Sequence, residues 1–311
     1  MPVIAIDLGG TKISGAVFDS EGNRLHQAAG FLEGKKGAEV GQLVTTIISE
    51  LQQTAGAADI EAIGICVPGI SDTKTGLVWA PNIPGWENYP LQKEVEANCI
   101  CPVVIAGDRS CHILGETWKG AAQGANDAVF IAVGTGIGMG ILANGQILNG
   151  RAGISGAAGW LALDMKYEAD YVQYGCFESN ASGNGIARCA QRLVKESVFK
   201  DSLLKAYPVE NITAYEVFDA WSKNDSLAAQ VIERAVQLWG MAAANIVSLF
   251  NPEIIVWGGG MFGPAAQLLD RIYEEACRWA QPIAIRQVRF EISQLGGDAG
   301  LYGAGRLVLN N

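Results

Sequence analysis

Short apolar runs that end at glycine-containing turns recur along the chain and predict an α/β protein. The clearest runs, which are typical of buried strands, are VIAID, IEAIGICVPG, CPVVIAGD, AVFIAV and PEIIVWGGG. Apolar residues at helical spacing lie between them, as in residues 41–56 and 265–280. The second half of the chain repeats the opening order of strand, glycine turn and strand. This order indicates a duplicated topology, without a sequence repeat of fixed period.

Length and composition indicate a globular chain of two domains. The chain has 311 residues, of which 49% are hydrophobic and 17% charged, and single cores stop growing near this size. Its net charge of −10 argues against nucleic acid or an anionic membrane as the main partner. The opening MPVIAIDLGG has no basic segment before its apolar run, so we expect no signal peptide and a cytoplasmic protein. The uncharged stretch 128–150 has the length of a membrane span, but its glycines and turns favour short buried strands.

Cysteine and histidine content argues against a disulfide framework and a metal cluster. The seven cysteines are scattered and odd in number, which fits reduced thiols. Cys99 and Cys101 are closely spaced but lack a second pair that would complete a metal site. His26 and His112 are the only histidines, so a histidine-rich metal site is excluded.

The motif DLGGTK follows the first predicted strand and offers groups that suit a phosphate and a metal. Asp7 ends the strand, Gly9 and Gly10 let the backbone turn tightly, and Thr11 and Lys12 add a hydroxyl and an ammonium group. Such a turn presents backbone N–H groups to phosphate while the carboxylate orients a hydrated Mg²⁺. The alternative is an ordinary Gly-Gly hairpin with a solvated aspartate.

A second glycine turn, VGTGIGMG, repeats this arrangement. Gly134, Gly136 and Gly138 leave the backbone bare, and Thr135 adds a hydroxyl. The alternative is a glycine-rich hairpin in a core. No P-loop spacing occurs in the chain, which excludes that class of nucleotide-binding protein.

A third glycine cluster, EIIVWGGGMFG, formally matches a dinucleotide-binding motif. Gly258, Gly260 and Gly263 have the spacing G-x-G-x-x-G after a strand, so a nicotinamide-dependent dehydrogenase is a remote alternative. The acidic residue expected about 20 positions further on would have to be Glu291, which comes several residues late.

Asp108 in VIAGDRSC stands where ligands bind in open α/β sheets. It follows a strand and precedes a helix, and the carboxyl ends of strands form ligand crevices in such folds. A carboxylate there can accept the proton of a hydroxyl group during phosphoryl transfer. The alternative, a helix N-cap, is compatible with that role.

Taken in order, the motifs resemble those of the ROK family of sugar kinases and repressors. They are DLGGTK, VPGISDTKTGLVWAPNIPGW, GDRSC, GTGIGMGILANGQILNGRAGISGAAG, GCFE with SGNGIA, WGGG and GDAGLYGAG. The resemblance implies two α/β domains of the ribonuclease-H-like, actin-like ATPase type, with a ligand cleft between them. We place the N-terminal domain at residues 1–110 with a C-terminal helix at about 299–311, and the C-terminal domain at residues 111–298.

The resemblance implies ATP and Mg²⁺ as cofactors and a small sugar or sugar derivative as substrate. Asp108 matches the catalytic base, and Asp7 matches the residue that holds Mg²⁺ through water. The positions that match the nucleotide side are Asp7, Gly9, Gly10, Thr11, Lys12, Gly134, Thr135, Gly136, Gly138, Gly258, Gly259 and Gly260. The positions that match the sugar side are Gly69, Asn82, Gly107, Asp108, Ala157, Trp160 and Glu178. A homodimer is expected from the resemblance alone. The chain begins at its first strand, without the DNA-binding extension of the family's repressors, which favours the kinase branch.

The chain departs from the family at the sugar and at a zinc site. Ala157 and Trp160 replace the Glu and His of the family pattern G-E-x-G-H, and Gly107 replaces an Asn. Only Cys176 remains of the zinc cysteines, so we expect no bound zinc. Trp160 either fills the volume that the metal leaves, which we favour, or offers a flat face on which a sugar ring stacks.

These observations predict an ATP-dependent kinase of a sugar or sugar-like polyol with an altered sugar pocket. The alternative is a sensor of sugar or nucleotide that has lost turnover. The presence of Asp7, Thr11 and Asp108 weighs against the sensor.

Overall fold

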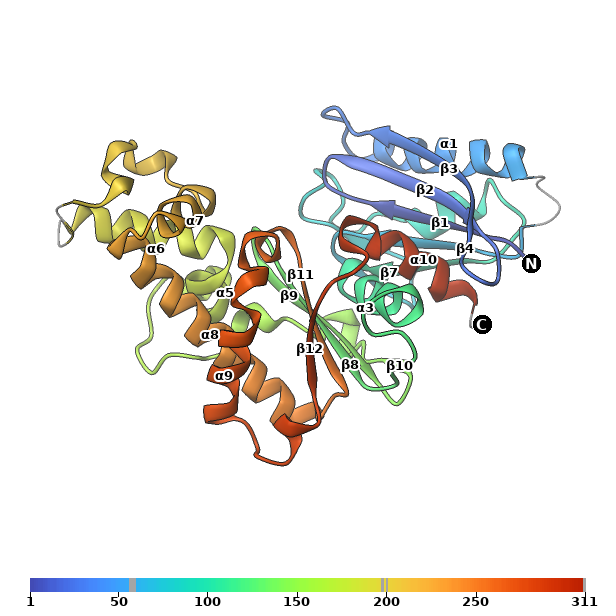
Figure 1. The fold of residues 1–311 in the computed structure, drawn as a ribbon. Coiled ribbons are helices and arrows are strands. Elements are labelled where there is room, and N and C mark those ends of the chain that lie inside the picture. Colours follow the sequence, from blue (N-terminus) through green and yellow to red (C-terminus); the bar gives the residue numbers. More distant parts are fainter. Residues whose placement is uncertain (56–59, 197–198, 200, 310–311) are drawn as a thin grey trace. The chain divides into compact units, whose positions relative to one another are not determined.

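Two five-stranded sheets with the same strand order organise the computed structural model, which describes residues 1–55, 60–196, 199 and 201–309 (Figure 1). The first sheet has the order β3-β2-β1-β4-β7, with β1 (Val3–Leu8), β2 (Lys12–Phe18), β3 (Arg24–Phe31), β4 (Ile63–Val67) and β7 (Val103–Gly107). The second has the order β10-β9-β8-β11-β12, with β8 (Ala128–Val133), β9 (Ile137–Ala143), β10 (Gln146–Ile147), β11 (Ile254–Gly258) and β12 (Arg289–Ile292). The shared order confirms the predicted duplication of topology.

Helices and short strands occupy the connections between these strands. The short strands are β5 (Ile70–Ser71) and β6 (Val78–Trp79). The helices are α1 (Ala38–Ala55), α2 (Leu91–Glu96), α3 (Asp108–Lys119), α4 (Tyr171–Tyr174), α5 (Cys176–Ala181), α6 (Gly183–Lys195), α7 (Ala214–Ser222), α8 (Ser226–Phe250), α9 (Leu269–Trp279) and α10 (Ala299–Leu309). Strand β1 is antiparallel to β2 and parallel to β4, which in turn is parallel to β7.

Strand β1 is apolar at every position except Asp7 because both faces of the first sheet are covered. Ile4, Ile6 and Leu8 belong to a core that includes the buried residues of α1. Val3 and Ala5, on the opposite face, belong to a second core shared with α3 and α10. A strand buried on both faces reads as a continuous apolar run, as the sequence does here.

Helices α3 and α10 approach each other through glycines. A Cβ atom on Gly115 of α3 would overlap the carbonyl oxygen of Ala299, and one on Gly303 of α10 would overlap that of Cys111. The two helices therefore pack backbone against backbone, and only glycine fits at these positions.

A buried carboxylate fastens the segment before α10 to α3. The side chain of Glu116 is fully buried. Its oxygens accept hydrogen bonds from the Ser293 hydroxyl (2.5 Å), the Leu295 N–H (3.2 Å) and the Ala121 N–H (2.8 Å). These partners offset the cost of burying a carboxylate.

The chain divides into two compact units. The first contains residues 1–128, 140–155 and 293–311, and the second contains residues 129–139 and 156–292. The boundary expected from the sequence, at residue 110, falls inside α3, whereas the whole of α3 belongs to the first unit, in which it packs on α10. Residues 310–311 of the expected C-terminal helix and residues 56–59 lie outside the described part of the chain.

The uncharged stretch 128–150 forms strands, as the sequence predicted. It supplies β8, β9 and β10 of the second sheet. Across the described residues, we find no helix whose length and apolar character would let it cross a membrane.

We expect Gly303→Ala to lower the free energy of unfolding by about 1–3 kcal/mol or more, since the added methyl group would overlap the Cys111 carbonyl oxygen. Gly297→Ala is the matched control, because a Cβ atom there has no neighbour within 4 Å; its effect should stay within about 0.5 kcal/mol. Urea unfolding of both variants measures the difference. Equal stability of the two variants would contradict the packing described here.

Candidate active site

The first glycine turn places Asp7 at the start of α10. A Cβ atom on Gly300 would lie 2.8 Å from either carboxylate oxygen of Asp7. Burial raises the pKa of Asp7, while His112 and a hydrogen bond from the Cys66 thiol act in the opposite direction. A carboxylate in such surroundings gains from a nearby cation. The site therefore fits a hydrated Mg²⁺, which binds through one or two carboxylates and keeps several waters.

Asp108 is the first residue of α3 and lies near Asp7. Its charge contributes to the raised pKa of Asp7, and its Oδ1 accepts a hydrogen bond from the Arg109 N–H at 2.8 Å. The predicted N-cap role of Asp108 is wrong: Gly107 is the N-cap residue, and it has no side chain to make a capping bond. The carboxylate of Asp108 is half-buried and does not cap the helix, so it is available to a ligand.

The other predicted residues of the first unit gather around these two carboxylates. A Cβ atom on Gly10 would lie 3.5 Å from the Cβ atom of Asn82. A Cβ atom on Gly107 would overlap the carbonyl oxygen of Gly69, and one on Gly69 would overlap that of Trp79. The asparagine that the family has at position 107 would not fit this backbone, because its side chain would collide with the Gly69 carbonyl oxygen.

The second glycine turn holds Glu178 in the second unit. The Ile137 N–H donates to Oε2 of Glu178 at 2.7 Å. A Cβ atom on Gly136 would lie 2.6 Å from the same oxygen, and one on Gly159 would lie 3.0 Å from it. Burial raises the pKa of Glu178, and the bond from Ile137 opposes that shift. The glycines thus let the turn close over this carboxylate.

A pocket in the second unit brings the second and third glycine clusters together. Gly134, Thr135 and Gly260 line one pocket of about 390 Å³. The Gly183 N–H at the start of α6 donates to the Gly134 carbonyl oxygen at 2.8 Å. Gly259 has a φ of 86°, and a Cβ atom there would lie 2.5 Å from the Val133 carbonyl oxygen, so the turn after β11 crosses the end of β8.

The sequence did not identify most of the lining of this pocket. The further residues are Gly183, Asn184, Ala187, Gln191, Glu210, Ile212, Thr213, Ala214, Tyr215 and Met261. Only the motif SGNGIA, which opens α6, pointed to this wall. Met261 belongs to the third glycine cluster, and the other residues come from α6, α7 and the segment between them, which carries no chemical signal in the sequence.

Trp160 does not fill the volume of the missing zinc site. It is 55% exposed, so the favoured packing role is wrong. Tyr171, at a family cysteine position, is buried instead; its hydroxyl accepts from Asn180 Nδ2 at 3.0 Å, and its pKa is raised by burial. The zinc positions carry Trp160, Ala169, Tyr171 and Cys176, a set that does not fit zinc. Within the described residues, no three His, Cys, Asp or Glu side chains group to hold a metal.

The segment 150–160 contributes to both units. Residues 150–155 belong to the first unit, where Gly153 and Ser155 line a pocket together with Gly69 and Gly107. Residues 156–160 belong to the second unit and run beneath the turn at Gly175, whose Cβ atom would overlap the Gly159 carbonyl oxygen. Its small residues therefore serve close backbone packing at two places.

Comparison with known proteins gives consistent likenesses. A family model described as ROK family matches residues 3–311. A glucokinase of Halalkalibacterium halodurans is 34% identical over 314 residues, which cover 98% of this chain and 94% of the relative. The ROK hexokinase of Thermus thermophilus superposes with a TM-score of 0.83 at 29% identity, covering 98% of this chain and 97% of the other. A ROK family glucokinase of Streptomyces griseus, in complex with glucose and AMPPNP, gives 0.75 at 29% identity over all of both chains.

These likenesses confirm the predicted actin-like ATPase fold and overturn the dehydrogenase alternative. The structure agrees on the second point, since β11 leads into the short 3-10 turns Gly260–Phe262 and Pro264–Leu268 before α9 begins. A dinucleotide-binding motif requires the helix to start at the glycines.

We expect Tyr171→Ala to lower the free energy of unfolding by about 3 kcal/mol, because it empties a buried ring site. Tyr171→Phe, which removes only the bond to Asn180, should cost about 1 kcal/mol. Denaturant titration of the two variants separates ring packing from the hydrogen bond. A harmless Tyr171→Ala would show that the ring does not support this region.

We also expect the purified protein to hold no stoichiometric zinc, since Cys176 alone of the four zinc positions is a ligand type that zinc prefers. Elemental analysis and thermal unfolding with and without a chelator test this. About one zinc per chain, or a loss of stability on chelation, would contradict it.

Proposed function

Because the chain belongs to the ROK family, we propose that it transfers the terminal phosphoryl group of ATP to a hydroxyl group of a sugar or sugar derivative. The observation that carries the proposal is the convergence of Asp7, Gly10, Asn82 and Asp108 in the first unit. The glucokinase relative, and the Streptomyces structure that contains glucose and AMPPNP, support both the nucleotide and the class of acceptor.

Asp108 acts as the general base in this proposal. Its carboxylate orients the acceptor hydroxyl and takes its proton as the new O–P bond forms. Asp7 holds Mg²⁺ through water, and bound Mg²⁺ supplies positive charge beside the phosphate oxygens. The backbone N–H groups of the turns at 9–12 and 134–138 face the phosphates, and the pocket lined by Gly134, Thr135 and Gly260 receives the adenosine.

The sugar side is proposed to use Gly69, Asn82, Glu178 and Trp160. Glu178 is fixed by the Ile137 N–H, so it offers hydroxyl groups a carboxylate in a defined place. The exposed face of Trp160 is free to stack on a sugar ring. Ala157 and Gly107 supply no polar side chain, so the first two carbons of the sugar are held less tightly than in relatives with Glu and Asn there.

We further propose a cytoplasmic enzyme that needs Mg²⁺ and forms a homodimer, with neither nucleic acid nor membrane as a partner. All seven cysteines are free thiols, which suits a reducing compartment.

A steady release of ADP with any acceptor separates the kinase from the alternative, a sensor that binds sugar or nucleotide without turnover.

Asp108→Asn should lower turnover by roughly 10²–10⁴, the range for the loss of a general base, while nucleotide affinity and the free energy of unfolding stay near the original values. Glu87→Gln, at an exposed carboxylate of the same unit, is the matched control. Coupled ADP-release kinetics measure both. Turnover of Asp108→Asn at the original rate would remove Asp108 from the chemistry.

Free glucose should be a poorer acceptor than a sugar altered at its first two carbons, such as a glycoside, a disaccharide or a polyol. A site that has lost the partner of a hydroxyl group discriminates weakly for it. The measurement is kcat/KM for glucose, methyl glucoside and a glucose disaccharide. A preference for glucose above about tenfold, roughly 1.4 kcal/mol, would mean that another group replaces the missing glutamate.

A further inference from the structure

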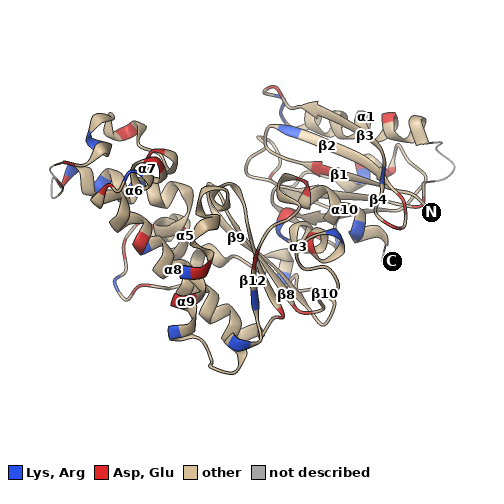
Figure 2. Cartoon of the chain, in the orientation of Figure 1, with Lys and Arg blue, Asp and Glu red and all other residues tan. Residues whose placement is uncertain are grey.

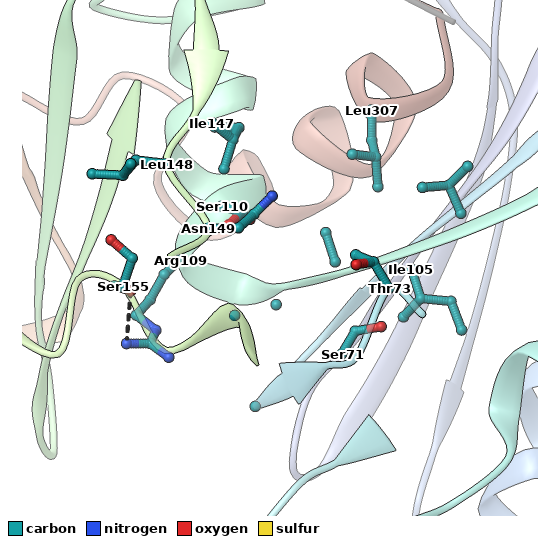
Figure 3. Close-up of a pocket in the computed structure, with 15 residues that line it drawn as sticks. Ser71, Thr73, Ile105, Arg109, Ser110, Ile147, Leu148, Asn149, Ser155 and Leu307 are labelled. Carbon is teal, nitrogen blue, oxygen red and sulfur yellow. Dashed lines mark hydrogen bonds between the residues drawn. The ribbon is translucent and has the colours of Figure 1, made fainter. Parts of the chain in front are cut away.

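A pocket of the first unit shares walls with the proposed acceptor site (Figure 3). Its volume is about 210 Å³, and Gly69 and Gly107 both line it. Asp108 follows Gly107 directly in the chain, so the pocket adjoins the residue proposed as the general base. A substituent on the acceptor would lie close to it.

The polar part of the lining contains one cationic side chain and several groups that can donate hydrogen bonds. Arg109, the hydroxyl groups of Ser71, Thr73 and Ser110, and the amide of Asn149 line the pocket (Figure 3). Within the described residues, no Asp, no Glu and no aromatic side chain lines it. Ser155 also lines the pocket, and the remaining walls are aliphatic side chains or glycine backbone.

The guanidinium group of Arg109 uses few of its N–H donors within the protein. Its Nη1 donates to the Ser155 carbonyl oxygen at 3.3 Å, a long bond (Figure 3). The neighbouring carboxylate, Asp108, accepts from the backbone N–H of Arg109 and does not line the pocket. An arginine carries five N–H donors in a fixed fork, so most of the fork is open to a ligand.

Arg109 differs in this respect from several other arginines. Acidic and basic residues are interspersed along both units (Figure 2). Arg24 pairs with Asp298, Arg234 with Asp164 and Arg271 with Glu233. Among the ion pairs found in the described residues, none includes Arg109. In a chain of net charge −10, an arginine in a pocket without acids is well placed for an anion from outside.

The guanidinium group of Arg109, with no carboxylate or aromatic side chain in the same lining, suits an anion better than a neutral sugar ring. Sugar hydroxyl groups donate as well as accept, and a matching site offers carboxylates and an aromatic face, which this pocket lacks. Carboxylate and phosphate oxygens only accept, and the arginine fork matches their geometry.

We propose that this pocket binds an anionic group, a carboxylate or phosphate, that the acceptor sugar carries as a substituent. The inference rests on the proposed kinase function and narrows its substrate class to acidic sugar derivatives. Arg109 is the residue that selects for the charge, and Ser71, Thr73, Ser110 and Asn149 add donors around it.

The test compares acceptors that differ only in charge. Glucose ethers with a carboxymethyl group on O1, O2 or O3 are each paired with the neutral carbamoylmethyl ether, which has the same shape. Calorimetry gives the Kd of each ether, and coupled ADP release gives kcat/KM. At one of the three positions, the carboxymethyl ether should bind at least about tenfold more tightly than its neutral partner, as expected for charge-assisted hydrogen bonds.

Variants locate the effect. Arg109→Gln should reduce the carboxymethyl-to-carbamoylmethyl ratio to within about threefold, whereas Arg109→Lys should keep part of it, because the charge remains without the fork. Arg151→Gln is the matched control, since Arg151 is an exposed arginine of the adjacent loop that does not line the pocket; it should keep the whole ratio. Thermal unfolding confirms that each variant is folded.

The outcomes separate the two proposals. The absence of a charge preference at all three positions, or a preference that survives Arg109→Gln, overturns the pocket assignment. Inorganic phosphate and glycolate are titrated as free anions; if they bind through Arg109 while the attached carboxylate adds nothing, the pocket serves free anions and the substituent proposal is wrong. Phosphorylation of neutral ethers without a charge preference refutes the pocket alone. A charge preference in binding without any ADP release refutes the kinase alone.

Discussion

The close approach of α3 and α10 is the constraint on which the first unit depends. The two helices meet backbone to backbone at Gly115 and Gly303. Asp108 begins α3, and Gly300 at the start of α10 lies against Asp7. The helix contact therefore sets where both carboxylates stand, although neither takes part in it. A segment from the end of the chain thus determines the geometry of a site whose two carboxylates lie far earlier in the sequence.

Tight backbone packing also explains how the acceptor side departs from its relatives. Position 107 has no room for a side chain, because β7 ends against the Gly69 carbonyl oxygen, which itself lies under the segment at Trp79. Three segments thus meet at this point, and glycine at position 107 fits their contact. The pocket that Gly69 and Gly107 line contains Arg109 and no carboxylate.

At the positions of the missing zinc site, side-chain packing is found where the family has metal ligands. Tyr171 stands at one of the family's zinc positions, where its ring is buried and its hydroxyl accepts a hydrogen bond from Asn180. Trp160 takes no part in this and keeps an exposed ring. Of the two aromatic residues at the zinc positions, only Tyr171 is therefore packed into the protein.

The sequence by itself determined the strands, the duplicated topology and the glycine turns with Asp7 and Asp108, because apolar periodicity and turn chemistry are local properties of the chain. It also identified the positions where the family's polar residues are absent. Only the tertiary structure decided that α3 belongs with the first unit, that Tyr171 is buried whereas Trp160 is exposed, and that Arg109 lines a pocket without acids. Those facts depend on contacts between segments far apart in the chain, and no pattern within a single segment records which partner it meets.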